Sequence, residues 1–331
     1  MKRLTLLAAL FAAAFCAYAT DGVLEINQVK LDAAGGTYVI SQPGSYRLTS
    51  NLTQTNASAD VIQVTASNVT IDLNGFSIAG STTCTFVTAS SSVVCNPPGP
   101  GVGINFVVQG LAVNGVVRNG SVKRIGSACI KGAHLVEDVL AESCGQGAGV
   151  SADVVRRVQV SFSGVGRAIV ADHAIDSVAS GNGGVGIEGS TEVVGCRSEN
   201  NVGDGIYVSG AGTVRNSSSA GNLGHGIRVG GGLVSGNIIE SNKGAGIMSG
   251  ISQLTSVIGN VIDHNGSDLV NSHCGIQFYG PPGVALTSQN ILYENGPPNA
   301  SPGFDFAICN SVSQHLPSMP PNTNLCNGAA C

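Results

Sequence analysis

The stretch from Asn201 to Gly230, NVGDGIYVSGAGTVRNSSSAGNLGHGIRVG, contains nearly the same phrase twice. GDGIYV is followed twenty-one residues later by GHGIRV. A repeat at this spacing indicates stacked structural units of about twenty residues, and it decides the fold class before any single residue is considered.

The same unit recurs along most of the chain. Each copy has an apolar residue that ends a G-x-G-I-like phrase, and these anchors are Ile130, Val150, Ile169, Ile187, Ile206, Ile227, Ile247 and Ile276. An asparagine stands five residues before four of the anchors, at positions 182, 201, 222 and 242, and a second asparagine series occupies positions 237, 260 and 290. The phrase VSGNIIESNKGAGI, from Val234 to Ile247, is one complete unit.

The unit predicts an all-β parallel β-helix, a solenoid of coils of about twenty residues. It is too short for a strand–helix–strand crossover, which needs ~30 residues, and it lacks the apolar period of a helix. Glycine suits the tight corners, and stacked asparagine amides can bond from coil to coil. The anchors Ile187, Ile206, Ile227 and Ile247 should therefore stack in one inward column.

Composition limits the partners that the protein can have. The 331 residues are only 11% charged, against about 25% in ordinary soluble domains, and they include 47 glycines and no tryptophan. The net charge of −5 offers no basic face, so nucleic acid is not an expected partner. No cofactor motif is present, and no Cys-x-x-Cys pair or His/Cys cluster suggests zinc, so we expect neither a cofactor nor a metal.

The N-terminus, MKRLTLLAALFAAAFCAYAT, has the features of a secretory signal peptide over residues 1–19. A basic start precedes a short apolar run, and Ala17-Tyr18-Ala19 is an A-x-A cleavage site. The run is too short to span a bilayer. We therefore expect a mature protein that does not span a membrane and is secreted, periplasmic or on the cell surface.

Nine cysteines follow the predicted signal peptide, and export places them where disulfides persist. An odd number leaves at least one unpaired. Cys84 and Cys95 flank one loop and are expected to be bonded. One further bond is expected among Cys309, Cys326 and Cys331.

The repeats and the opening GTYVISQPGSYRLTSNLT (from Gly36) resemble the right-handed parallel β-helix proteins of the pectate-lyase-like superfamily, especially exported bacterial ones. The resemblance covers most of residues 36–310 and implies a single right-handed β-helix domain over residues 20–310. Within it we expect residues 20–35 to cover the first coil, a lateral loop at about 81–103, and elongated coils at about 248–310. Residues 311–331 should form a cap without regular structure. The superfamily includes lyases, hydrolases, epimerases and adhesins, so the fold does not assign a reaction.

One surface gathers the candidate site residues. Side chains alternate along a strand, so the residue after each anchor should point outward, and this row includes Glu188, Tyr207 and Arg228. Asp204 and His225, two residues before their anchors, should be neighbours on adjacent coils. We predict an acid–base pair of Asp204 and His225, with Arg228 to hold an anionic sugar and Glu188 and Tyr207 as binding residues.

The phrase GHGIRVG also resembles a polygalacturonase motif in which a histidine lies near catalytic aspartates. Here the second aspartate and the downstream Arg-x-Lys phrase are missing. The alternative is that His225 occupies a variable, solvent-facing turn position of the repeat. In that case His225→Ala should cost no more than ~0.5 kcal/mol of stability.

The elongated coils carry further polar and aromatic residues. Asp263, His264, Asp268 and His273 have metal-ligating side chains, but loop residues of these types are common and no metal site is predicted. The aromatic residues Phe278, Tyr279, Tyr293, Phe304 and Phe306 would either stack on sugars or close the end of the core.

These observations favour an exported β-helix protein that interacts with polysaccharide or a cell-surface glycan, without an assigned reaction. Two alternatives stay open. One is a hydrolase or lyase that acts on an acidic glycan, and the other is an adhesin or a structural rod.

Overall fold

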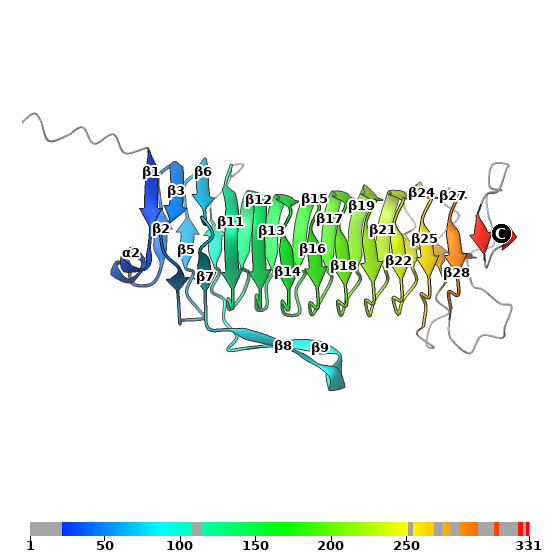
Figure 1. The fold of residues 1–331 in the computed structure, drawn as a ribbon, viewed down its shortest axis with the longest axis horizontal. Helices are drawn as coiled ribbons and strands as arrows, with labels where there is room; N and C mark the ends of the chain where they lie inside the picture. Colours follow the sequence, from blue (N-terminus) through cyan, green and yellow to red (C-terminus); the bar gives the residue numbers. More distant parts are fainter. Residues whose placement is uncertain are drawn as a thin grey trace, which may run out of the picture.

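The computed structural model describes residues 22–107, 114–250, 254–267, 274–278, 285–296, 308–310, 324–326 and 329–330. They form a parallel β-solenoid of about 11 turns, with 53% of the residues in strands (Figure 1). The predicted signal peptide lies outside the described residues. The described helices include none that is long and apolar enough to cross a membrane.

The strands stack in three rows that run the length of the solenoid. Row A starts at each anchor and consists of β2 (Tyr38–Ile40), β5 (Ile62–Val64), β10 (Ile104–Phe106), the first parts of β12 (Ile130–Glu142), β13 (Val150–Arg156), β15 (Ile169–Ile175), β17 (Ile187–Val194), β19 (Ile206–Arg215) and β21 (Ile227–Ser235), and then β23 (Ile247–Ser249), β26 (Ile276–Phe278) and β29 (Ile308–Asn310).

Row B consists of β1 (Val23–Ile26), β3 (Gly44–Leu48), β6 (Val69–Asp72), β11 (Val116–Lys123), the later parts of β12, β13, β15, β17, β19 and β21, and then β24 (Thr255–Ile258) and β27 (Ala285–Ser288). Row C consists of β4 (Leu52–Thr53), β7 (Ser77–Ala79), the ends of β11 and β12, β14 (Gln159–Ser161), β16 (Val178–Ser180), β18 (Arg197–Glu199), β20 (Ser218–Ala220), β22 (Ile238–Glu240), β25 (Val261–Asp263), β28 (Ile291–Tyr293) and β30 (Leu325–Cys326).

The predicted inward column is confirmed. Ile187, Ile206, Ile227 and Ile247 are paired in register from coil to coil. Each of them is fully buried. Burial of an isoleucine side chain contributes roughly 1.5–3 kcal/mol, so a column repeated in every coil supplies much of the solenoid's core.

Two asparagine ladders run parallel to this column, as the repeats predict. One connects Asn182, Asn201, Asn222, Asn242, Asn265 and Asn295, and each side-chain amide donates to the Oδ1 of the next. The other connects Asn237, Asn260, Asn290 and Asn324 in the same way. All of these asparagines are buried, so the ladders satisfy polar groups that would otherwise be costly inside the solenoid.

Glycine before the anchor is required by close packing rather than by a turn. A Cβ added at Gly205 would lie 2.1 Å from Ser219 Oγ and 2.6 Å from Asn222 Nδ2. Ser219 and Asn222 belong to the next coil, so the interior has no room for a side chain at this position. The G-x-G-I phrase thus records contact between successive coils.

The ends of the solenoid differ in part from the expectation. At the N-terminal end the short helix α2 (Gln28–Ala33) buries Leu31 in the core (Figure 1). At the other end β30 continues row C beside β28, and β31 (Ala329–Ala330) pairs with it in antiparallel fashion. The prediction of a tail without regular structure is therefore wrong at β30, because Asn324 and Leu325 prolong the ladder and the strand row.

The predicted lateral loop is an ordered hairpin. β8 (Thr83–Val87) and β9 (Ser92–Asn96), joined around the 3-10 turn η1 (Thr88–Ser90), pair only with each other and project beside the solenoid (Figure 1). The hairpin packs against glycine corners, since a Cβ at Gly164 would lie 3.1 Å from Cys95 Sγ. It therefore rests against the solenoid's side next to the middle coils.

The predicted disulfide between Cys84 and Cys95 is confirmed, and it joins the two hairpin strands. A second bond, between Cys129 and Cys144, was not predicted. Cys274 is also in a disulfide. Cys196 is buried and free, in agreement with the odd number of cysteines.

Candidate functional site

The predicted outward row exists as a line of side chains on row A. Glu188 pairs in register with Tyr207, and Tyr207 pairs with Arg228. Successive coils lie about 4.8 Å apart, so the three side chains occupy consecutive steps along the solenoid. The sequence therefore located these neighbours correctly from the repeat alone.

Asp204 and His225 are also brought onto adjacent coils, and both bind backbone groups of the next coil. Asp204 Oδ1 accepts the backbone N–H of His225 at 2.8 Å. His225 Nδ1 accepts the backbone N–H of Ala245 at 3.0 Å. The two side chains therefore have the same role one coil apart: each accepts a backbone N–H of the next coil. His225 accepts with the lone pair of Nδ1.

For Asp204, this geometry differs from the solvent-facing turn position that the repeat pattern suggested as an alternative. Asp204 is only 9% exposed, because its side chain turns along the solenoid toward the next coil. Its second oxygen, Oδ2, lies 3.6 Å from Arg228 Nη1. Asp204 is therefore both a link between coils and the anionic partner of an outward arginine.

Arg228 and Tyr207 form an amphipathic pair at the surface. The guanidinium carbon of Arg228 lies 5.1 Å from the centre of the Tyr207 ring. The Arg228 side chain is 48% exposed. A partly exposed ring beside a planar cation offers both a stacking surface and hydrogen-bond donors.

Glu188 is held by a residue that the sequence analysis did not assign to the site. Arg167, at the position equivalent to Asp204 two coils earlier, forms an ion pair with the Glu188 carboxylate. Partial burial raises the pKa of the Glu188 carboxyl, and the charge of Arg167 opposes that rise. A carboxyl with a raised pKa is a better proton donor than an ordinary exposed glutamate.

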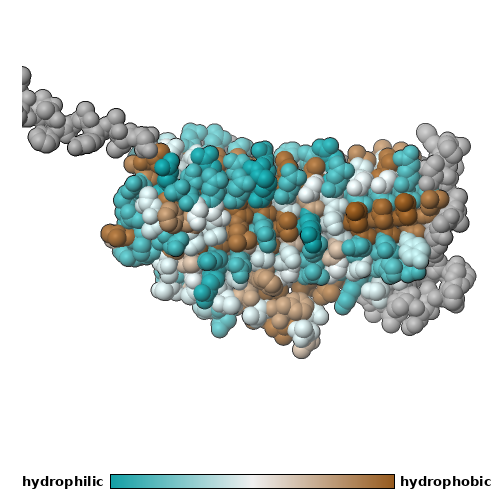
Figure 2. Space-filling view, in the orientation of Figure 1, coloured by the Kyte–Doolittle hydropathy of each residue, from teal (hydrophilic) through white to brown (hydrophobic). Residues whose placement is uncertain are grey.

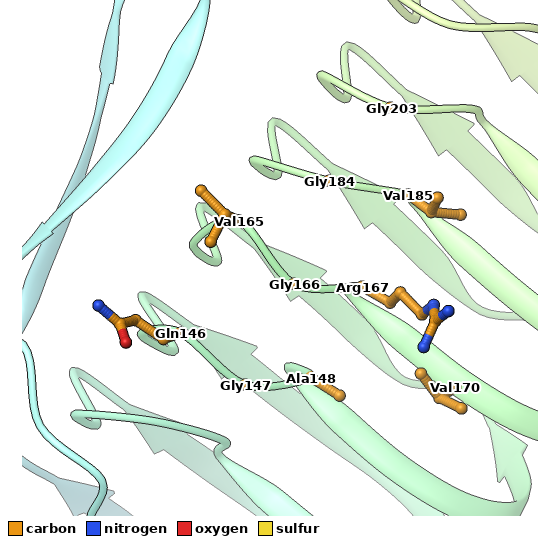
Figure 3. A pocket seen from close by; sticks show the side chains of 10 residues that line it. All are labelled: Gln146, Gly147, Ala148, Val165, Gly166, Arg167, Val170, Gly184, Val185 and Gly203. Atoms are coloured by element: carbon orange, nitrogen blue, oxygen red, sulfur yellow. The ribbon is translucent and has the colours of Figure 1, made fainter.

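A hollow lies beside this line of side chains. It has a volume of about 530 Å³ and is lined by Gln146, Gly147, Ala148, Val165, Gly166, Arg167, Val170, Gly184, Val185 and Gly203. Figure 3 shows that these residues come from equivalent places on successive coils, with Gln146 and Val165 on the corners and Arg167 near the strands. Four of the ten lining residues are glycines. Val170 pairs in register with Glu188, so the hollow joins the line at its N-terminal end.

The hairpin stands close to the same hollow. A Cβ at Gly183 would lie 3.0 Å from Cβ of Val93 in β9. Gly183 is next to Gly184, which lines the hollow. The hairpin, the glycine corners and the outward row therefore define one side of the molecule, which we call the groove side.

Other sequence candidates lie elsewhere. His264 contacts Asp263 through Nδ1 at 2.6 Å and Glu294 through Nε2 at 2.7 Å, which makes a local ion-pair group. Asp268, His273, Tyr279, Phe304 and Phe306 lie outside the described residues. Across the described ranges no group of three His, Cys, Asp or Glu side chains is arranged to hold a metal ion.

Sequence reasoning missed a polar line three or four positions beyond the anchors, between the paired segments of row A and row B. His134 Nδ1 lies 2.8 Å from Asp153 Oδ2, and Ser190 donates to Asp172. Register shifts at the β12–β13 and β15–β17 pairs place these residues. A strict count from the anchors cannot anticipate such bulges, although the recurrence of Asp at positions 153 and 172 was visible.

Comparison with known proteins agrees with the fold. Residues 173–314 match a family model described as "Right handed beta helix region". No curated protein sequence matches the chain.

Solved structures of similar shape span nearly the whole chain. The A-module of the mannuronan C-5 epimerase AlgE6 from Azotobacter vinelandii aligns with a TM-score of 0.53 and 16% identity, over 98% of this chain and 92% of that module. The corresponding AlgE4 module gives 0.50 and 15%, over 88% and 93%. A tailspike protein mutant of E. coli bacteriophage HK620, in complex with a pentasaccharide, gives 0.51 and 13%, over 90% of this chain and 60% of that one. The chain therefore has the fold of a right-handed parallel β-helix.

Proposed function

We propose that the protein binds a polysaccharide along its groove side. The observation that carries the proposal is the unbroken line of Glu188, Tyr207 and Arg228 on consecutive coils, which continues into the hollow at Val170. The coil spacing of about 4.8 Å is close to the length of one sugar unit, so an extended glycan can meet one side chain per unit. The similar structures include epimerases of mannuronan and a tailspike in complex with a pentasaccharide, which supports this ligand class.

The chemistry of the line suits a glycan that carries carboxylates. Arg167 and Arg228 are both about half exposed, and each is already paired with a protein carboxylate. A sugar carboxylate could join either guanidinium in a two-pronged contact, because arginine has five donors. Tyr207 between them offers a ring for the apolar face of a sugar.

The test is a binding titration of the purified protein against acidic and neutral polysaccharides. Arg228→Ala should weaken binding of an acidic glycan at least about tenfold, since it removes a charged hydrogen-bond donor. Arg197→Ala is the matched control, because Arg197 is an exposed, paired arginine on row C rather than on row A. Equal effects of the two substitutions, or binding of neither glycan class, would refute the proposal.

A polysaccharide hydrolase or lyase that uses Asp204, His225 and Arg228 is the second candidate. It is favoured by the juxtaposition of these residues, with Asp204 Oδ2 3.6 Å from Arg228. Glu188, with its raised pKa, could act as proton donor. The assay follows reducing ends and unsaturated products, and turnover that survives Asp204→Asn and Glu188→Gln would exclude these roles. In the same assays an adhesin would bind glycan without turnover. A structural rod would neither bind glycan nor show turnover.

We also propose that the protein is exported to the periplasm, the cell surface or the medium. The signal-like residues 1–19 and the disulfides Cys84–Cys95 and Cys129–Cys144 support this location. N-terminal sequencing of the protein from its native cell should begin at Thr20. A start at Met1 would contradict export by this route.

A further inference from the structure

The C-terminal coils expose a continuous row of aliphatic side chains on row C. Ile238, Val261, Ile291 and Leu325 are the first residues of β22, β25, β28 and β30, and they pair in register from coil to coil. Their exposed fractions are 52%, 40%, 48% and 42%. Figure 2 shows the row as a band of hydrophobic residues over the coils where Figure 1 places β22, β25 and β28. We call these four residues the aliphatic strip.

The strip is confined to one part of row C. The equivalent residues of the preceding coils are Gln159, Val178, Arg197 and Ser218. Single exposed aliphatic residues are common, but four in line form a patch of the kind that marks an interaction site. The inward residues beside them, Ile239, Ile262 and Leu292, already fill the core, so the strip has no packing role inside the solenoid.

We propose that the aliphatic strip docks against the strip of a second copy of this chain. The strip is linear, carries no charge, and repeats at the coil spacing of about 4.8 Å. A second strip has the same spacing, so its side chains meet this one at every step, whereas an unrelated surface would match it at one or two. The proposal is independent of the glycan site on row A.

The charges beside the strip select the relative orientation of the two copies. Two residues further along the strands stand Glu240, Asp263 and Tyr293, also on the outward side. A two-fold axis perpendicular to the strip would bring the acidic Glu240–Asp263 edges of both copies to the same side, where they repel. A two-fold axis along the strip puts each acidic edge over the partner's uncharged corner. The two solenoids should therefore lie parallel, with each strip residue facing its own equivalent.

Four side chains supply less than the roughly 800 Å² per partner of a standard stable interface. The association should therefore depend on concentration within the micromolar range. Sedimentation of the full mature chain between about 1 and 200 µM should show a monomer–dimer equilibrium. The double substitution Val261→Lys with Ile291→Lys should raise the dissociation constant at least about tenfold, because it places paired positive charges at the contact.

The matched control is Gln159→Lys with Ser218→Lys, which adds the same charge on the same row outside the strip. It should leave the dimer unchanged, and circular dichroism should show both variants folded. Both should keep the polysaccharide affinity of the parent, which separates this proposal from the proposed function. A monomer at all concentrations, or a dimer that the strip variant does not weaken, would overturn the proposal.

Cross-linking tests the orientation without a charge change. The Ile238→Cys variant should form a disulfide-linked dimer under mild oxidation, because the two copies of this position face each other. In an antiparallel pair the same positions would be several coils apart and would remain unlinked. Absence of the covalent dimer in a sample that sediments as a dimer would refute the parallel arrangement.

Discussion

At the residue scale, the side chains of Asp204 and His225 have a structural role that the sequence pattern concealed. Each accepts a backbone N–H from the following coil, so the x of G-x-G-I can carry a bond between coils. Alanine or valine occupies this position in several other coils and makes no such bond through its side chain. The glycine frame therefore tolerates many residues while two of them add a specific link.

The cost of His225→Ala follows from this link. The substitution leaves the backbone N–H of Ala245, itself fully buried, without its acceptor. We expect a loss of about 1–2 kcal/mol, more than the ~0.5 kcal/mol expected for an exposed turn. Chemical denaturation measures the difference, with His173→Ala as control, since the His173 side chain is 42% exposed and its Nδ1 lies 3.7 Å from Glu192 Oε2. A change below ~0.5 kcal/mol would restore the solvent-facing interpretation.

Cys196 gives the residue scale a pH-dependent prediction. Burial raises the pKa of its thiol to about 11 from an ordinary value of 9.0. The folded protein thus holds the proton more tightly than the unfolded chain does, so this contribution is complete below pH 9 and is lost as pH rises toward 11. It should amount to roughly 2 kcal/mol.

The measurement compares the stability of the parent with that of Cys196→Ala between pH 8 and pH 11. The free energy of unfolding of the parent should fall relative to that of the variant across this interval. The comparison between the two proteins cancels the titration of all other groups. Parallel curves for the two proteins would show that the thiol is not desolvated in the folded state.

At the element scale, the asparagine ladders do for side chains what strand pairing does for the backbone. Asn222 accepts the backbone N–H and the side-chain amide of Asn201, and donates to Asn242 and to the carbonyl of Ser198. Removal of one step leaves unsatisfied groups on both sides. A step inside the ladder therefore matters more than any single surface bond.

We expect Asn222→Ala to destabilise the protein by about 3 kcal/mol or more, because several buried donors and acceptors lose their partners at once. Thermal unfolding followed by circular dichroism gives the change. Gln159→Ala, which removes an exposed amide on row C, should alter stability by less than about 0.5 kcal/mol. Similar values for the two substitutions would mean that the ladder contributes nothing beyond ordinary surface polarity.

The elements show what sequence could predict and why the rest escaped. Spacing alone predicted the anchors, both ladders and the outward neighbours Glu188, Tyr207 and Arg228. In a solenoid, residues that are one repeat apart in the sequence lie one coil apart along the axis. The partner Arg167 and the Asp153–Asp172 line were missed because they depend on side-chain reach and on bulges. The Cys129–Cys144 bond was missed because it joins two buried positions 15 residues apart, which is less than one coil. The repeat spacing predicts only which residues lie above one another in successive coils.

At the scale of the whole molecule, each coil contacts only its neighbours, so stability should be nearly a sum over coils. Deletion of residues 206–226 removes one coil and joins Gly205 to Ile227. Glu188 would then adjoin Arg228 on row A, and Asn201 would adjoin Asn242 in the ladder. We expect a folded, shorter protein that has lost glycan affinity together with Tyr207.

Deletion of residues 206–215 is the control, because it removes half a coil and destroys the alignment of the rows. The half-coil variant should not fold and should show no cooperative unfolding transition. The full-coil variant should fold and should keep a cooperative transition. Circular dichroism and calorimetry distinguish the two. Failure of both deletions to fold would mean that the coils are not interchangeable units.

The Cys129–Cys144 bond has a consequence for how the chain finds its structure. Successive coils carry the same anchors, ladders and glycines, so a coil could stack on the second-nearest coil almost as well as on the nearest. A bond that closes one coil on itself, with the hairpin of β8 and β9 lying beside it, occurs at one place and cannot be satisfied by a shifted stack. These unrepeated features give the nascent solenoid a fixed origin from which the later coils are counted, and so protect a repetitive chain from folding out of register.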